Sequence, residues 1–366
     1  MLRTCRARAL GVVVGLAALS VALAGCGASA SGRARATRPS PPSSSRSAAT
    51  SPASPRRAPP KPAPRIGLSP PAALARFPTA PVVAGEGSWA PSGRRVDGVP
   101  AVFETTLVPP GGSQPAGIAW MDTRLLSARL YSGSISPGGG PYPYTAPIQQ
   151  AQARSLVAAF NGGFKMAAAG GGYYTTGKTI VPLVAGAASL VIYAGGSMTV
   201  GTWGATVTMA PNVVSVRQNL VLLVLGGRPT PQASSPDWLS WGATCGVTTC
   251  TGPGVEHQWR SGVGVTADGA LVYVTGPALS PLQLAELLVR AGAIRGMQLD
   301  INPYWTVFVT YDPATPDGAP RRRTAPSSSP RRCRDRQPSS TPPGPGISSR
   351  CRRGRREAEH RAVEMT

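Results

Sequence analysis

The sequence predicts a single mixed α/β domain of the α+β type, rich in strands and with few helices. Most of its apolar residues occur in short runs separated by Gly, Pro and Ser, a pattern typical of strands joined by turns. Residues 281–291 combine a helical period with clear start and stop signals. Apart from an N-terminal apolar run, the patterned residues lie between positions 82 and 312, where we expect the folded domain.

The first half of this domain is expected to consist mainly of strands. They are predicted at residues 102–108, 117–121, 125–131, 156–160, 189–193 and 198–203. The last two flank Ala194-Gly195-Gly196-Ser197 and should form a hairpin. A short helix is predicted over residues 147–153, because proline is favoured in the first turn of a helix.

The second half of the domain has the strongest local signals. Strands are predicted at residues 213–216, 220–225, 262–266, 270–275, 294–299 and 305–310. Two of them flank Asp268-Gly269 and form the clearest hairpin of the chain. Ser280 is the expected N-cap of the helix over residues 281–291, and Gly292 its end.

The N-terminal 26 residues have the organisation of an export signal. Arginines at positions 3, 6 and 8 precede an apolar stretch, residues 9–22. Leu23-Ala24-Gly25-Cys26 then resembles the lipobox of bacterial lipoproteins, which implies lipidation of Cys26 and removal of what precedes it. The alternative is an ordinary secretory peptide with a chance cysteine. We therefore expect a lipid-anchored protein of the cell membrane, on its extracytoplasmic face in the cell envelope, or a secreted one.

Two further segments lack any apolar period. Residues 27–81 are rich in Ser, Pro, Arg and Ala, and we expect a disordered tether. Residues 313–366 contain arginine clusters among Ser and Pro, so a disordered basic tail is predicted there. Because this tail differs in composition from the rest of the chain, our hypothesis is that it is read out of frame. Resequencing of the locus tests this, and an unchanged frame would refute it.

The charge distribution argues against nucleic-acid binding. The net charge is +22, but residues 1–65 hold 11 of the Lys and Arg residues and residues 313–366 hold 13. Between Ile66 and Asp312 there remain 13 basic and 10 acidic residues, a net charge of +3. A nearly neutral domain lacks the basic face that nucleic acid requires.

The cysteines of the domain suggest a disulfide rather than a metal site. Cys245 and Cys250 are spaced Cys-x4-Cys, and an exported domain meets oxidising conditions, so a local disulfide is the natural interpretation. Zinc is not expected, because His257 is the only histidine of the domain and further ligands are missing. No metal and no cofactor are predicted.

Two enzyme classes find little support. Residues 172–179 match the phosphate-loop pattern GxxxxGK[ST], but no strand precedes them and Pro182 follows where a helix should open. A nucleotide hydrolase is therefore not expected. A serine hydrolase has no G-x-S-x-G motif in this sequence to support it.

Asn161-Gly162-Gly163-Phe164 is the first candidate site segment. It follows an apolar run, and paired glycines allow a ligand to approach the backbone closely. Asn161 adds an amide that both donates and accepts hydrogen bonds. The structural alternative is a tight turn between two strands, because Asn-Gly is a strong turn signal.

Glu256, His257 and Arg260 form the second candidate. They place a carboxylate, an imidazole and a guanidinium within five residues, just before the clear hairpin. Arg260 is suited to bidentate binding of a phosphate or carboxylate. The alternative is a solvated strand entry with a surface ion pair.

Asp300 is the third candidate, because a carboxylate at the end of an apolar strand is costly without partners. Asn302 and Tyr304 follow it, and aromatic rings beside polar groups suit sugars. The alternative is an Asx-type turn before Pro303. Asp268 and Glu286 are assigned structural and solvated roles, respectively.

Taken in order, these segments resemble the phosphodiester glycosidase family. The family pattern is an Asn-Gly-Gly-Phe turn, an Arg before a Gly-rich strand with an Asp-Gly hairpin, a leucine-rich helix, and a strand ending in Leu-Asp. This chain has Asn161–Phe164, Arg260–Gly264 with Asp268-Gly269, Leu284–Leu288 and Met297–Asp300. The resemblance covers roughly residues 102–309. It differs after Asp300, where Ile301–Trp305 replace the usual Gly-Gly-Gly-Ser turn.

The resemblance implies hydrolysis of a sugar-1-phosphodiester or a related glycosidic bond in the cell envelope. Arg260 would hold the anionic leaving group, and Asp300 or Glu256 would act as general acid or base. Asn161 and the backbone of Gly162 and Gly163 would position a carbohydrate or sugar-phosphate ligand. The alternative function is a non-catalytic lipoprotein that binds envelope glycans, which the missing Gly-Gly-Gly-Ser turn favours.

Overall fold

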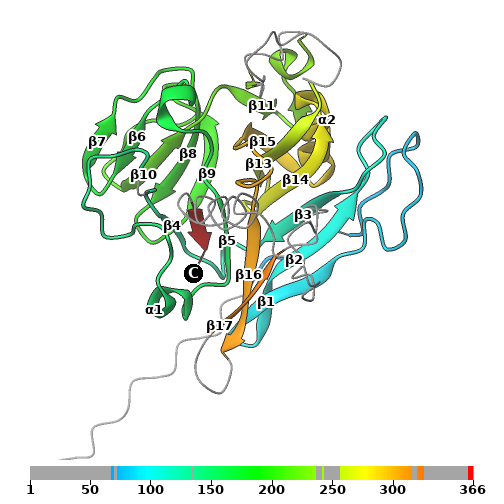
Figure 1. Ribbon diagram of the computed structural model, residues 1–366, viewed down its shortest axis with the longest axis horizontal. Helices are drawn as coiled ribbons and strands as arrows, with labels where there is room; N and C mark the ends of the chain where they lie inside the picture. Colours follow the sequence, from blue (N-terminus) through cyan, green and yellow to red (C-terminus); the bar gives the residue numbers. More distant parts are fainter. Residues whose placement is uncertain are drawn as a thin grey trace, which may run out of the picture. The chain divides into compact units, whose positions relative to one another are not determined.

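The computed structural model describes residues 67–69, 72–133, 135–235, 241–242, 256–314, 320–324 and 362–365. In this part of the chain it is a strand-rich α+β domain with two α-helices and three antiparallel sheets (Figure 1). The fold class predicted from the sequence is therefore confirmed. Cys26, Cys245 and Cys250 lie outside the described residues, so the lipidation site and the disulfide stay predictions.

The largest sheet has eight strands. Their order is β1 (Ala90–Val96), β2 (Val99–Leu107), β3 (Ala116–Met121), β14 (Leu271–Leu279), β13 (Gln258–Thr266), β15 (Ala293–Gln298), β11 (Leu222–Leu225) and β12 (Arg228–Pro229). The predicted hairpin around Asp268-Gly269 is confirmed as β13 and β14, with Val263 opposite Tyr273. It lies at the centre of this sheet, between β3 and β15.

Two five-stranded sheets complete the domain. One has the order β7 (Lys178–Val181), β6 (Tyr173–Thr175), β10 (Val213–Gln218), β8 (Ala188–Tyr193) and β9 (Met198–Thr202). The other has the order β17 (Pro320–Thr324), β16 (Phe308–Ala314), β5 (Ala158–Asn161), β18 (Ala362–Met365) and β4 (Ala128–Leu130). The predicted hairpin of β8 and β9 is confirmed.

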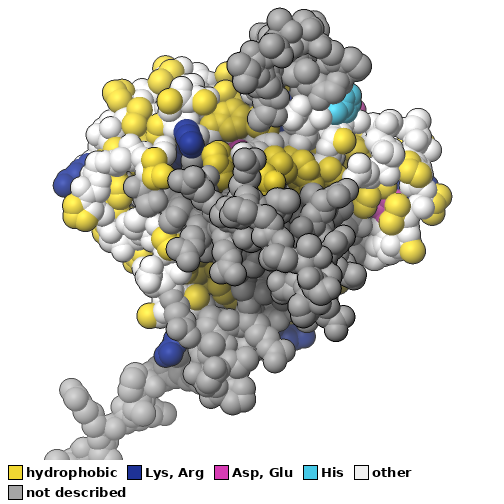
Figure 2. Space-filling model, in the orientation of Figure 1, with side chains coloured by type: hydrophobic (Ala, Val, Ile, Leu, Met, Phe, Trp, Pro, Cys, Tyr) yellow, Lys and Arg dark blue, Asp and Glu magenta, His cyan; other side chains and the backbone are white. Residues whose placement is uncertain are grey.

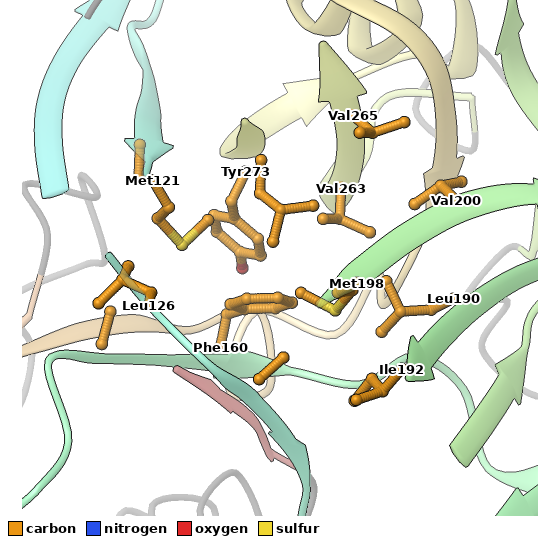
Figure 3. Packing of buried hydrophobic residues seen from close by; sticks show 14 of the residues in the cluster. Met121, Leu126, Phe160, Leu190, Ile192, Met198, Val200, Val263, Val265 and Tyr273 are labelled. Carbon is orange, nitrogen blue, oxygen red and sulfur yellow. The ribbon is translucent and has the colours of Figure 1, made fainter. Parts of the chain in front are cut away.

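The central strands of the large sheet are buried on both faces, and their side chains alternate between two cores. On β3, Ile118 and Trp120 join a cluster with the helix α2 (Pro281–Arg290), whereas Ala119 and Met121 join the cluster shared with the other sheets. Figure 3 shows this shared cluster, in which Phe160 of β5 lies beside Tyr273 of β14. Their ring centroids are 5.3 Å apart. This packing fixes the end of β5 against the centre of the large sheet.

Glycines in β13 and β15 allow α2 to lie close to the sheet (Figure 1). A Cβ atom at Gly262 would be 3.2 Å from Leu288 Cδ1, and one at Gly296 would be 3.1 Å from the same atom. These distances are shorter than ordinary packing contacts, so larger residues would push the helix away. The Gly-rich strand of the family pattern therefore has a packing function in this chain.

The helix α2 begins as predicted. Ser280 Oγ accepts a hydrogen bond from Gln283 N at 3.1 Å, and Gln283 Oε1 accepts one from Ser280 N at 2.9 Å, which forms a capping box.

Ser280→Ala removes this cap and is expected to lower the free energy of unfolding by about 1 kcal/mol. Chemical denaturation measures the change. Ser113→Ala, at an exposed turn position, is the matched control and should be neutral. A neutral Ser280→Ala would contradict the capping role.

Several predicted elements differ in their bounds. The α1 helix (Gln150–Ala153) begins three residues later than expected, with Gln149 as its N-cap. Residues 125–131 form a strand only at β4, and the strand expected from Trp305 begins at Phe308, since Asn302 starts a turn. Short 3-10 helices, η1 (Met166–Ala168) and η2 (Pro231–Ser234), were not predicted. Residues 172–179 belong to the hairpin of β6 and β7 and do not have the strand–loop–helix geometry of a phosphate loop.

The domain also extends beyond its predicted limits. Phe77 and Ala80 are buried in the cluster with α2, although the tether was predicted to continue to residue 81. Beyond Asp312, the strands β17 and β18 pair with β16, β5 and β4. The prediction of disorder therefore does not apply to these short ranges. The rest of both segments lies outside the described residues.

Candidate functional site

The end of β5 brings Asn161 into a buried hydrogen-bond network. Asn161 Oδ1 accepts from the Tyr273 hydroxyl at 2.6 Å and from Val307 N at 3.2 Å. Its Nδ2 donates to Ser261 Oγ at 2.9 Å. With its amide bonded to three protein groups, the Asn161 side chain holds the turn in place.

Ser261 joins this turn to the segment of Asp300. Its Oγ accepts from Asp300 N at 3.0 Å and donates to Asp300 O at 3.1 Å, in addition to accepting from Asn161. A backbone hydrogen bond also joins the two residues, since Ser261 N donates to Asp300 O at 2.8 Å. Three segments that are distant in the sequence therefore meet at one serine, which the sequence analysis did not select.

The Asp300 carboxylate is held by its own turn. Only 2% of the residue is exposed, and Oδ1 accepts from Ile301 N at 2.8 Å and from Asn302 N at 2.9 Å. Asn302 Oδ1 in turn accepts from Tyr304 N at 2.9 Å. The Asx-type turn that was the structural alternative is thus present.

Burial, with a smaller contribution from the charge of Asp300, raises the pKa of Tyr273, so the Tyr273 hydroxyl stays protonated.

Arg260 is fully buried, at 0% exposure, and bonded to protein acceptors. Its guanidinium donates to Leu279 O at 2.7 Å, Trp241 O at 3.2 Å, Gln298 Oε1 at 2.7 Å and Glu256 O at 2.9 Å. Burial lowers the pKa of Arg260 to about 10, while Glu256 opposes this shift. The side chain ties four segments together, and this geometry does not match the anion clamp that the resemblance implies.

The other two residues of the second candidate, Glu256 and His257, lie nearer the surface than Arg260 does. Glu256 is half-buried, and its backbone oxygen accepts from Arg260. His257 is exposed. The structure therefore does not bring the Glu256 carboxylate or the His257 ring into the Asn161–Ser261–Asp300 network by any described hydrogen bond.

A pocket opens beside the Asn161 turn. It is a shallow depression, and the space of about 300 Å³ between its walls includes open solvent. Its lining residues are Leu130, Tyr131, Gly133, Ser136, Pro137, Gly162, Gly163, Phe164, Met166, Tyr173 and Arg217. Gly162, Gly163 and Phe164 from the sequence prediction are among them, whereas Asn161, Arg260 and Asp300 are not.

Arg217 and Asn219 are site residues that the sequence analysis missed. Asn219 Oδ1 accepts from Phe164 N at 3.1 Å, and its Nδ2 donates to Gln298 O and Leu299 O, each at 3.0 Å. Arg217 donates to Phe164 O and to Gln218 O. The signal was available, because Arg217-Gln218-Asn219 interrupts an apolar strand with consecutive polar residues.

The turn after Asp300 packs against the Asn161 turn. Ile301 and Phe164 share a small buried cluster with Ala169. Farther along the turn, Tyr304 is 61% exposed, and Lys165 Nζ lies 5.3 Å from the ring centroid of Trp305. This part of the surface combines aromatic rings with a cation.

The face of the molecule in Figure 2 has few concentrations of charge. On the face in Figure 2 the basic side chains are scattered among hydrophobic and uncharged polar ones. Among the described residues, no group of three His, Cys, Asp or Glu is placed to hold a metal ion. The same part of the chain contains no helix long and apolar enough to cross a membrane.

No family model matches the chain, and no curated protein sequence matches it. The catalytic domain of zebrafish N-acetylglucosamine-1-phosphodiester alpha-N-acetylglucosaminidase, auto-inhibited by its pro-peptide, is similar over 64% of this chain and 79% of that chain. The identity is 18% and the TM-score 0.38. A hypothetical protein from Synechocystis is similar over 64% and 61% of the two chains, at 13% identity and a TM-score of 0.34. A Burkholderia pseudomallei protein described as exported is similar over 60% of this chain and 76% of that chain. The identity is 13% and the TM-score 0.31. Likenesses this weak concern the fold alone and assign neither substrate nor activity.

Gly163→Ala is expected to lower the free energy of unfolding by about 2 kcal/mol or more. Gly163 has φ +106°, and a Cβ atom there would be 3.1 Å from Asn219 Oδ1. Gly177→Ala is the matched control, since Gly177 has φ +79° but open space around it, and should cost only the backbone strain of about 1 kcal/mol. Urea denaturation compares the two variants. Equal losses would contradict close packing of the turn on Asn219.

Proposed function

We propose that the protein hydrolyses a sugar-1-phosphodiester or a related glycosidic bond. The observation that carries this proposal is the junction at Ser261. There, the side chain of Asn161 and the backbone of Asp300 are bonded to the same hydroxyl, beside a pocket lined by Gly162, Gly163 and Phe164. This junction supports the proposal that the segments resembling the phosphodiester glycosidases form one site.

In the proposed reaction, water attacks the anomeric carbon. The bond between that carbon and the phosphate oxygen breaks, hydroxide adds to the carbon, and the proton passes to the departing phosphate oxygen. Asp300 supplies the general acid or base. The Gly162-Gly163 backbone faces the ligand, while Asn161 positions this backbone.

We place this activity in the cell envelope. The lipobox-like segment ending at Cys26 supports anchoring of the protein to the membrane on its extracytoplasmic face. A carbohydrate or sugar-phosphate of the envelope would then be the ligand.

A second candidate function is glycan binding without cleavage. It is favoured by the Asp300 carboxylate, which accepts hydrogen bonds from the amides of its own turn. The exposed ring of Tyr304 on the same turn is suited to stacking on a sugar.

Release of free sugar from UDP-N-acetylglucosamine by the purified full chain tests the proposal. The wild-type protein should release sugar, and Asp300→Asn should slow the release by about 100-fold or more. Asp97→Asn is the matched control, because Asp97 is exposed in a turn with φ +48° and should keep its rate. Equal rates for Asp300→Asn and wild type would remove Asp300 from the mechanism. Binding without release of sugar would favour the second candidate.

A further inference from the structure

Arg217 places a buried cation at the wall of the pocket. It is 6% exposed and lies on β10, with its guanidinium donating to the carbonyls of Phe164 and Gln218. The ring of Tyr173 lies 6.0 Å from its Cζ atom. Because Phe164 belongs to the Asn161 turn, Arg217 connects this turn to the neighbouring sheet at the pocket.

The polar groups around Arg217 are suited to an anion. None of the described residues that line the pocket is acidic. The Tyr173 hydroxyl shares a hydrogen bond of 2.8 Å with Ser132 Oγ, and burial raises its pKa to about 12 although Arg217 acts against this shift. Tyr173 is therefore neutral at physiological pH and adds no negative charge to the wall.

A buried cation such as the Arg217 guanidinium interacts strongly with a charge on a ligand. Surrounding protein screens the charge less than bulk water does, so an anion in the pocket is attracted more than at an exposed arginine. A guanidinium also carries five N–H donors in a planar fork that matches phosphate oxygens. A guanidinium can therefore donate hydrogen bonds to protein carbonyls and to an anion at the same time.

We infer that Arg217 is the anion-binding residue of the pocket and selects ligands that carry a phosphate group. This inference rests on the proposed function, since it assigns the phosphate of the substrate to this pocket. It also moves the anion contact from the buried Arg260 to a residue on the pocket wall. The sugar would then lie toward the Gly162-Gly163 backbone.

Isothermal titration calorimetry of the full chain tests the inference. The probes are inorganic phosphate, α-glucose 1-phosphate and glucose. The wild-type protein should bind glucose 1-phosphate at least 10-fold more tightly than glucose, and more tightly than phosphate alone if the sugar also contributes. Arg217→Gln should lower the affinity for glucose 1-phosphate at least 10-fold without changing the affinity for glucose. The exposed-cation control, Arg228→Gln, should bind all three as the wild type does.

Arg217 is buried, so folding of its variants is checked by circular dichroism and thermal unfolding. Arg217→Lys keeps the charge but loses the planar set of N–H donors, and should retain part of the preference for glucose 1-phosphate over glucose. Met166→Trp, at a half-buried lining position, leaves Arg217 in place and should reduce binding of both sugar probes by narrowing the pocket.

The inference and the proposed function fail in different ways. Equal affinities of folded Arg217→Gln and wild type for glucose 1-phosphate would overturn the inference, even if sugar release from UDP-N-acetylglucosamine continues. Absence of glucose 1-phosphate binding to the wild type would overturn it as well. Phosphate-dependent binding that requires Arg217, without any sugar release, would support the inference while the hydrolase proposal fails.

Discussion

Replacement of Arg260 by methionine is expected to lower the free energy of unfolding by about 3 to 5 kcal/mol, because several buried acceptors lose a donor at a cost of about 1 to 3 kcal/mol each. The guanidinium is fully buried and donates to Leu279, Trp241, Gln298 and Glu256. Methionine fills much of the space but removes the guanidinium donor of these acceptors, which is the main cost, although Trp241 O keeps a second donor, Gln298 Nε2 at 2.7 Å. Equilibrium denaturation in urea measures the change.

Two comparisons make this prediction specific. Arg260→Lys keeps a charge but cannot reach four acceptors with one ammonium group, so an intermediate loss is expected. Arg228→Met, at an exposed position, should change stability by less than about 0.5 kcal/mol. If Arg260→Met unfolds like the wild type but loses ligand binding, Arg260 is an anion clamp and the structural role described above is wrong.

Asn161→Ala is expected to cost about 3 kcal/mol or more of unfolding free energy. The substitution removes the partner of the buried Tyr273 hydroxyl and of the half-buried Val307 N, and one of the partners of Ser261 Oγ, which keeps its hydrogen bonds to Asp300. Each buried group that is left without a partner costs about 1 to 3 kcal/mol. Thermal and urea unfolding of the variant give the loss.

A double-mutant cycle with Tyr273→Phe isolates the contact between the two side chains. Tyr273→Phe in the Asn161→Ala background should cost less than in the wild type, because it removes a hydroxyl that already lacks its acceptor. Asn212→Ala, an exposed turn residue, is the neutral control. Additive losses for Asn161→Ala and Tyr273→Phe would contradict the network.

The elements with strong local signals were predictable from the sequence. The hairpin around Asp268-Gly269 and the helix after Ser280 depend on turn and capping residues that act within a few positions. The bounds of β4 and α1 were less predictable. Before β4, for example, Leu125 and Leu126 are buried in the core although they lie in a turn and not in a strand. The pairing of β18 with β4 and β5 depends on contacts across more than 200 residues, for which the tail has no local pattern.

The candidate site was predictable in its location more than in its roles. The order of Asn161, Arg260 and Asp300 identified segments that do meet in space. Their side chains proved to be buried, because each finds protein partners that no spacing rule includes. Ser261 was overlooked beside the more conspicuous Arg260. Arg217 was overlooked because the polar run Arg217-Gln218-Asn219, although it interrupts an apolar strand, belongs to no known motif.

The proposed glycosidic cleavage is tested most directly by the position of a water oxygen in the product. UDP-N-acetylglucosamine is incubated with the protein in H₂¹⁸O, and the UDP formed is measured by ³¹P NMR. Attack at the anomeric carbon leaves the bridging oxygen on the phosphate, so we predict UDP whose β-phosphate contains no ¹⁸O. A β-phosphate that contains ¹⁸O, or no formation of UDP, would contradict the proposed function.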